Sequence, residues 1–177
     1  MLRPEPLPLE TPRLLLRAFT FEDAPAMYAG WAADPEVTRF LTWLPHESVQ
    51  VSHDTIGYWL MTNDPTWCVV EKASMRPVGS LSVVAYDLKA ETAEAGYCYS
   101  RAVWGRGYGA EALRALIDAL FTRFGAKRVT AKHDLENPNS GRVMQKAGMT
   151  LDRIEPKYAK NNFGMRDMAI YQILRGE

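Results

Sequence analysis

The sequence predicts a mixed α/β fold in a single domain. Its 177 residues, of which 47% are hydrophobic and 24% charged, are enough for one domain with a sizeable core. Helix signals dominate the first third, strand-like segments fill the middle, and helices and strands alternate toward the C-terminus. No linker, repeat or low-complexity segment interrupts residues 1–177, so we expect one domain.

The N-terminal third begins with a proline-rich, extended lead-in that ends at Pro12. Glu22 and Asp23 put acid in the first turn of a helix, and Asp34 before Pro35 is a second helix-start signal. The predicted elements here are a strand at 13–19 and helices at 24–32, from 35 onward, and at 48–61.

Strand-like segments begin at residue 66. Within 78–86, Leu81, Val83 and Ala85 alternate with their neighbours, as expected of a strand with one buried face. From Leu113 to Phe124, apolar residues recur at helical spacing and predict a long amphipathic helix. The predicted elements here are strands at 66–71, 78–86, 93–100, 127–132, 149–154 and 165–174, and helices from 110 to 124 and from 137 to 147.

The charge balance limits the classes of partner. Lys and Arg number 21, as do Asp and Glu, and a net charge of zero argues against nucleic-acid binding through bulk positive charge. No apolar run approaches the roughly 20 residues that span a bilayer. Cys68 and Cys98 lie in separate apolar stretches, which favours reduced thiols, and no Cys/His cluster has metal-ligand spacing. We expect a cytoplasmic protein without nucleic acid, membrane or metal.

The glycine-rich segment 104–110 joins a predicted strand to the long helix. Glycine permits positive φ values that aim successive N–H groups into one concavity, and the helix dipole adds about half a positive charge there. Such a turn predicts a phosphate or pyrophosphate site, with Arg101 and Arg106 as neighbouring cations. The alternative interpretation is a turn that only connects a strand to a helix.

The same segment matches the dinucleotide fingerprint G-x-G-x-x-[GA], with Asp134 near the place of a ribose-binding acid. Three features count against that alternative. Residues 101–104 separate the strand from the turn, little chain follows Ala110, and the preceding strand is not the buried apolar run of a parallel sheet.

Three motifs occur in order along the chain. Residues 104–112 read W-G-R-G-Y-G-A-E-A, residues 11–17 with 22–24 form a strand and a helix start, and residues 137–140 and 146–149 read N-P-N-S and K-A-G-M. Together they resemble the GNAT superfamily of acetyl-CoA-dependent N-acyltransferases, in particular its ribosomal-protein N-terminal alanine and serine acetyltransferase-like branch. Trp104 stands where the wider family has Arg or Gln, and Met149 where the branch has Phe. The resemblance covers about residues 9–174.

The resemblance implies a three-layer fold with a mostly antiparallel, splayed sheet of six or seven strands and about four helices. Acetyl-CoA, a co-substrate, would lie where strands 93–100 and 127–132 part, because pantetheine amides can satisfy the backbone groups that the parting frees. The cofactor-binding residues that it implies are Tyr99, Arg101, Trp104, Gly105, Arg106, Gly107, Tyr108, Gly109, Ala110, Asn137 and Ser140.

Acetyl transfer requires a deprotonated amine, so a base must remove its proton. Glu94 is the candidate base, and a surface carboxylate at a strand start is the plainer interpretation. By resemblance, Ser140 lies near the thioester sulfur and protonates the leaving thiolate, with Tyr158 as the competing acid. A strand N–H near Cys98 or Tyr99 would polarise the carbonyl.

Two candidate residues also have structural interpretations. Asn137 before Pro138 suits a helix N-cap, and Glu111 complements the dipole of the long helix. The expected function is acetyl transfer to a primary amine, such as a protein N-terminus, by direct attack in a ternary complex. A dinucleotide-binding oxidoreductase module and a non-catalytic acyl-CoA sensor are the alternatives, and we expect a monomer or homodimer.

Overall fold

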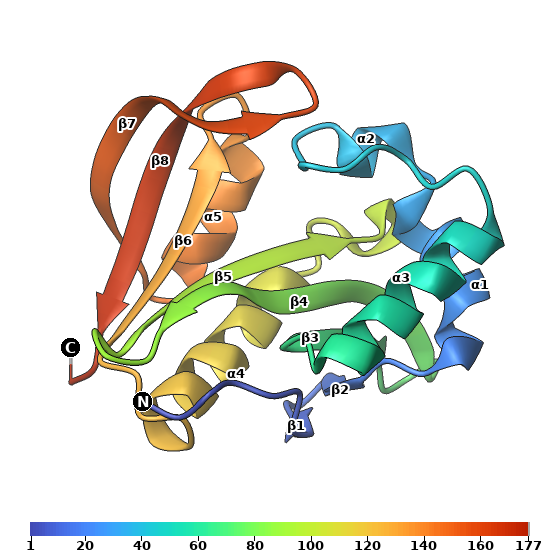
Figure 1. Cartoon of the computed structure of the whole chain (residues 1–177), viewed down its shortest axis with the longest axis horizontal. Coiled ribbons are helices and arrows are strands. Elements are labelled where there is room, and N and C mark those ends of the chain that lie inside the picture. The colour runs from blue at the N-terminus through green and yellow to red at the C-terminus, as the bar shows by residue number, and fades with distance from the viewer. Residues whose placement is uncertain (177) are drawn as a thin grey trace.

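The computed structural model describes residues 1–176 and contains an eight-stranded sheet with helices on both faces (Figure 1). The strand order is β1-β2-β3-β4-β5-β6-β8-β7. Every neighbouring pair is antiparallel except β5 and β6, which are parallel. The strands are β1 (Leu9–Glu10), β2 (Leu14–Ala18), β3 (Thr66–Glu71), β4 (Arg76–Asp87), β5 (Thr92–Tyr99), β6 (Arg128–Asp134), β7 (Thr150–Asn161) and β8 (Gly164–Leu174).

Five α-helices form the outer layers. They are α1 (Ala24–Met27), which continues as a π-helical turn through Ala32, α2 (Pro35–Thr38), α3 (Val49–Thr62), α4 (Tyr108–Thr122) and α5 (Pro138–Lys146). The helix starts follow the predicted chemistry, because Asp34 accepts from Glu36 N at 3.0 Å and Ser48 from Val51 N at 3.4 Å. Asn63, at φ 49°, ends α3 in the left-handed conformation.

The predicted fold class is confirmed, and the counts differ slightly: eight strands against six or seven, and five α-helices against about four. The prediction for one face of β4 was wrong. The register between β4 and β5 shifts between Val83 and Ala85, so Val83 is buried and Ala85 is exposed. A bulge of this kind inserts one residue and reverses the alternation beyond it.

Two apolar clusters flank the sheet. The first packs the stripe of α4, including Leu113, Leu116 and Leu120, against the sheet face that α5 also covers. The second packs Trp31 and Ile56 from the early helices against the opposite face. Both cysteines are free thiols, as predicted. None of the helices within residues 1–176 has the length and apolar character needed to cross a membrane.

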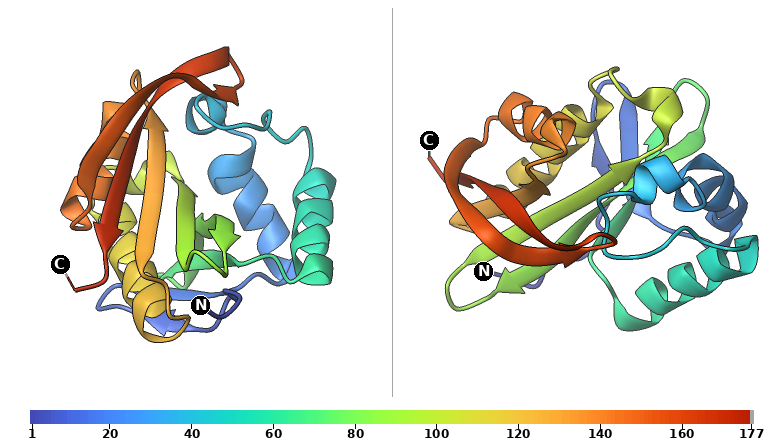
Figure 2. Two further views of the ribbon diagram at one scale, coloured as in Figure 1. Left: turned by 60° about the vertical axis from the view of Figure 1, so that its left-hand side comes forward. Right: turned by 90° about the horizontal axis from the view of Figure 1, so that it is seen from above.

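The tip of the β7–β8 hairpin reaches across to the segment after α2 (Figure 2). There Asn162 N donates to Leu41 O at 3.1 Å, and its side-chain amide donates to Thr38 O at 3.0 Å and to Trp43 O at 2.8 Å. The two arms of the molecule, which part at β5 and β6, are therefore joined again at this tip.

Candidate active site

Strands β5 and β6 part halfway along their length (Figure 1). Their parallel pairing runs from Thr92 with Arg128 to Ala95 with Ala131, while β5 continues to Tyr99 and β6 to Asp134. Among the described strands, β5 is paired beyond Ala95 only with β4, and β6 is paired beyond Ala131 only with β8. The splay expected between these strands is therefore present.

Backbone groups of β5 face the opening at alternate residues. Ser100 N donates to Val78 O at 2.9 Å, and the antiparallel register makes Cys98 the next residue whose N–H and C=O turn to β4. The N–H groups of Tyr97 and Tyr99 accordingly turn away from β4. Tyr99 O accepts from Trp104 Nε1 at 2.8 Å, which agrees with this direction. Of the two N–H groups named for carbonyl polarisation, the alternation favours Tyr99 over Cys98.

The glycine-rich loop has the backbone expected of an anion cradle. Gly105 and Gly107 have φ values of 76° and 80°, which side chains of L-residues rarely adopt, and Gly107 is the N-cap of α4. A Cβ at Gly105 would project into open space, with no heavy atom within 4 Å. Space favours a glycine at position 109 for a different reason. A Cβ added at Gly109 would lie 3.2 Å from the Tyr99 ring and 3.3 Å from Val143, which is too close for ordinary contact.

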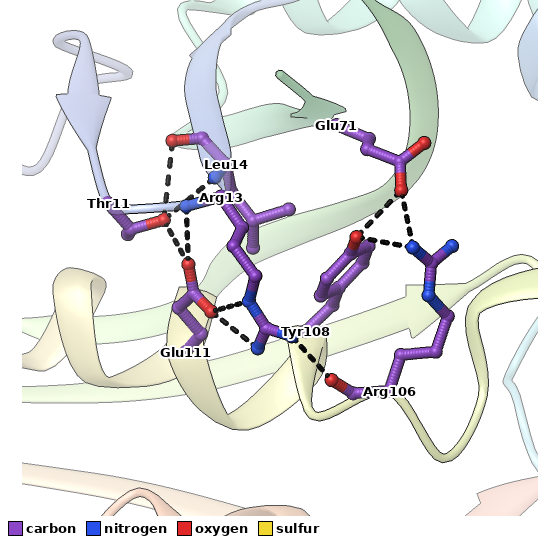
Figure 3. A network of polar contacts seen from close by, with 7 residues as sticks. All are labelled: Thr11, Arg13, Leu14, Glu71, Arg106, Tyr108 and Glu111. Atoms are coloured by element: carbon purple, nitrogen blue, oxygen red, sulfur yellow. Dashed lines mark hydrogen bonds and ion pairs between the residues drawn. The ribbon is translucent and has the colours of Figure 1, made fainter. Parts of the chain in front are cut away.

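Arg101 and Arg106, the two arginines expected near the phosphates, are both paired with carboxylates. Arg106 lies 2.8 Å from Glu71 Oε1 and donates to Tyr108 Oη at 2.8 Å (Figure 3). Tyr108 is itself buried, and its hydroxyl donates to Glu71 at 2.6 Å. Arg101 Nε donates to Asp34 Oδ2 at 2.5 Å, on the N-cap of α2. A phosphate role for either guanidinium group requires an exchange of partner and stays a prediction.

Glu111 does more than complement the helix dipole. Its Oε1 accepts from Thr11 Oγ1 at 2.5 Å and from Arg13 N at 3.0 Å, and its Oε2 accepts from Arg13 Nε at 2.6 Å (Figure 3). Burial raises the pKa of Glu111, but the hydrogen bonds from Thr11 and Arg13 outweigh burial and leave that pKa below its usual value. The carboxylate therefore fastens the β1–β2 turn to the first turn of α4.

A hollow of about 430 Å³ lies beside the loop. Arg114 and Lys146 border it, and neither forms an ion pair with a carboxylate of the described residues. No local pattern pointed to these two cations, since α4 and α5 meet only in the fold. The residues lining the hollow are Pro12, Arg13, Gly107, Ala110, Glu111, Arg114 and Lys146.

Asn137 and Ser140 lie at the start of α5, next to β5. Asn137 is the N-cap, and its side-chain oxygen accepts from Ser140 N at 3.4 Å, as the structural interpretation predicts. The Ser140 hydroxyl lies 2.9 Å from the hydroxyl of Tyr97, a residue that the sequence did not single out as a site residue. Burial raises the pKa of Tyr97.

Glu94 and Tyr158 border the same cavity, of about 190 Å³, which also includes Lys132. Glu94 forms an ion pair with Lys132, and the Lys132 ammonium lies 5.7 Å from the centre of the half-exposed Tyr158 ring. Alternation along β5 puts Glu94 on the sheet face opposite to Ala93 and Ala95, which pack toward α4. The candidate base and one candidate acid thus line one cavity.

The sequence model of the acetyltransferase (GNAT) domain matches residues 13–150, most of the chain. The chain belongs to the GNAT acetyltransferase family. It is an N-acetyltransferase, as expected, and this family uses acetyl-CoA. Three features fit such a co-substrate: the open Gly105, the outward N–H groups of Tyr97 and Tyr99, and the buried Tyr99 hydroxyl, which has no hydrogen-bond partner within residues 1–176.

Related sequences and structures are similar to this acetyltransferase over nearly its whole length. An uncharacterised N-acetyltransferase, p20, of Bacillus licheniformis is 29% identical and aligns over 96% of this chain and 97% of its own. A GNAT acetyltransferase structure from Bacillus anthracis has a TM-score of 0.87 at 24% identity, covering 97% of this chain and all of that one.

Two further structures are similar in fold. The microcin C7 self-immunity acetyltransferase MccE, in complex with acetyl-CoA and AMP, has a TM-score of 0.82 at 20% identity and covers 93% of each chain. RimL, the ribosomal L7/L12 α-N-protein acetyltransferase, has a TM-score of 0.82 at 18% identity, covering 95% of this chain and 94% of that one. The resemblance to ribosomal-protein acetyltransferases is thus confirmed at the level of fold.

Proposed function

We propose that the protein transfers the acetyl group of acetyl-CoA to a primary amine at a protein N-terminus, by direct attack in a ternary complex. The observation that carries this proposal is the splay between β5 and β6, which has the glycine loop at its open end and Glu94 at its closed end. Likeness of fold to an α-N-protein acetyltransferase supports the choice of acceptor. The same proposal includes a cytoplasmic location and a monomer or homodimer.

The chain's own groups divide the chemistry between them. The N–H groups of the loop and of the first turn of α4 hold the pyrophosphate, and Asn137 and the backbone near Tyr99 and Arg101 hold the pantetheine arm. Glu94, which forms an ion pair with Lys132, takes the proton of the attacking amine. The N–H of Tyr99 donates to the thioester oxygen, where negative charge develops.

Attack of the amine on the thioester carbonyl forms a C–N bond and a tetrahedral intermediate. When this intermediate collapses, the C–S bond breaks and leaves an amide and the CoA thiolate, which needs a proton. Ser140 supplies that proton in this proposal, because it lies at the opening of the splay beside Tyr97. Tyr158 is the competing acid, but its position beside Lys132 and Glu94 favours a place on the acceptor side.

Thiol release from acetyl-CoA, measured with a set of amines, tests the proposal. Thiol should be released from acetyl-CoA in the presence of peptides with a free N-terminal alanine or serine. The same peptides with a blocked N-terminus and an internal lysine should cause no release. Thiol release with small amines alone would refute the choice of acceptor. Binding of acetyl-CoA without transfer to any amine would favour the sensor alternative.

The choice of acid is tested by kinetics. Ser140→Ala should lower kcat by roughly 10²-fold with acetyl-CoA affinity retained. An active Ser140→Ala with an inactive Tyr158→Phe would transfer the role to Tyr158. The oxidoreductase alternative loses its structural basis, because only β5 and β6 are parallel among the described strands.

A further inference from the structure

A pair of hydroxyl groups joins the two arms of the splay. Tyr97 lies on β5, two residues beyond Ala95, the last residue paired with β6. Its hydroxyl lies 3.0 Å from Ser140 O and 2.9 Å from Ser140 Oγ and can donate to either oxygen. Ser140 belongs to the first turn of α5, the helix that follows β6. The contact therefore connects one separated strand to the element that continues the other.

Each hydroxyl carries a single proton, which allows this pair three arrangements. In the first, Tyr97 donates to the Ser140 carbonyl and accepts the serine proton. In the second, Tyr97 donates to Ser140 Oγ, and the serine proton is free to reach a third group. In a third, Tyr97 donates to the Ser140 carbonyl and the serine proton again points elsewhere, but Oγ then receives no hydrogen bond from Tyr97. Only the second arrangement both frees the serine proton and polarises the serine hydroxyl through Oγ, so the direction of the Tyr97 hydroxyl decides how strongly Ser140 can donate to a sulfur atom.

Tyr97 is suited to remain the donor. Its ring packs against the core cluster beneath the sheet, 6.0 Å from the ring of Tyr99. Burial raises the pKa of Tyr97, so the phenol keeps its proton throughout the range in which amines and thiols titrate. A phenol that does not ionise can stabilise charge on its neighbour without losing its own proton.

We propose that Tyr97 is a positioning residue for acetyl transfer, which donates to Ser140 Oγ and so directs the serine proton at the sulfur of the leaving thiolate. This inference rests on the proposed function, in which Ser140 faces that sulfur. Tyr97 forms no bond to substrate and gives up no proton. Its contribution is the hydrogen bond that it donates to Ser140 Oγ.

Equilibrium binding of CoA and of desulfo-CoA, which lacks the thiol, tests the proposal without an acceptor. The ordinary pKa of a thiol is about 8.5, so the thiolate forms as the pH rises from 7 to 9.5. The parent protein should increasingly prefer CoA over desulfo-CoA across that range. Tyr97→Phe should lose roughly threefold of this preference at pH 9.5, because the hydrogen bond from Ser140 to the thiolate is weakened when its donor is no longer polarised, while affinity for desulfo-CoA stays at the parent value.

The matched control is Tyr171→Phe. The Tyr171 hydroxyl, on β8, accepts from Gln145 Nε2 at 3.1 Å, and Gln145 lies on α5 as Ser140 does. Loss of the Tyr171 hydroxyl therefore perturbs α5 without removing a contact of Ser140. This variant should keep the parent preference for CoA. Ser140→Ala should lose the preference, and Tyr97→Phe in that background should cost no further factor, because both act through one hydrogen bond.

Three results would overturn the proposal. The first is a Tyr97→Phe variant that keeps the parent preference for CoA. The second is an equal loss of affinity for CoA and desulfo-CoA, which would show that Tyr97 only supports packing. The third is a double variant that loses the product of both single effects. Failure of the proposed function is separate, since it would appear as a parent protein that releases no thiol with any amine.

Discussion

The carboxylate of Glu111 offers the sharpest test of how the glycine-rich loop is held in place. Glu111→Ala removes three hydrogen bonds, of which two go to Arg13 and one to Thr11. Hydrogen bonds to charged groups contribute about 1.5–3 kcal/mol each, but the Arg13 side chain is 47% exposed, which reduces the share of the ion pair to about 1 kcal/mol or less. We expect Glu111→Ala to lower the free energy of unfolding by about 2–3 kcal/mol.

Glu111→Gln separates the two contributions. An amide oxygen in the place of Oε1 still accepts from Thr11 and from Arg13 N, while the amide nitrogen faces the guanidinium group that the carboxylate attracted. The expected loss is about 1 kcal/mol. Asp118→Asn, at an exposed acid of the same helix, is the control and should change stability by less than about 0.5 kcal/mol.

Urea unfolding at constant m-value measures these differences. The folded state lowers the pKa of Glu111, so its stabilisation is present above the ordinary carboxyl pKa and is lost as the pH falls through the lower folded value. Parent and Glu111→Gln should therefore converge in acid. A Glu111→Ala variant within about 0.5 kcal/mol of the parent at pH 7 would refute the reasoning.

Three further outcomes are expected. Gly107→Val should weaken acetyl-CoA binding at least tenfold by calorimetry, whereas Gly164→Val, at φ 98° in a turn far along the chain, carries comparable backbone strain and should bind normally. Asn137→Asp should keep the N-cap, and therefore the melting temperature, but raise the acetyl-CoA KM; unchanged KM would leave Asn137 as a cap only. Arg114→Ala should weaken acetyl-CoA binding more than Arg106→Ala, and more so at low salt, because Arg106 is already paired with Glu71; the reverse order would return the phosphate contact to the loop arginine.

Local patterns predicted those parts of the site that a few neighbouring residues determine. The glycine loop and the cap at Asn137 need only short-range geometry, and both have the predicted backbone. The exposure of Ala85 could not be predicted, because a period of two carries no sign of an inserted residue.

Contacts between distant segments were beyond local patterns altogether. Tyr97 and Ser140 lie 43 residues apart and meet only because β5 and β6 part. The pairing of Arg106 with Glu71 likewise depends on where β3 ends relative to α4. A charged side chain beside a phosphate loop can satisfy either a ligand or a neighbouring carboxylate, and the sequence shows only that the charge exists.

The hydrogen bonds between Asn162, at the tip of the β7–β8 hairpin, and the segment after α2 affect the order in which the molecule folds and opens. The hydrogen bonds of its side-chain amide connect Asn162 to residues that precede it by 124 and by 119 positions. The chain must therefore close a long loop before these hydrogen bonds form. Contacts of such sequence separation form late, and few buried groups support this tip. Amide hydrogens at the tip of the β7–β8 hairpin should consequently exchange with solvent well before those of α4, so this tip should separate from the segment after α2 while the rest of the molecule stays folded.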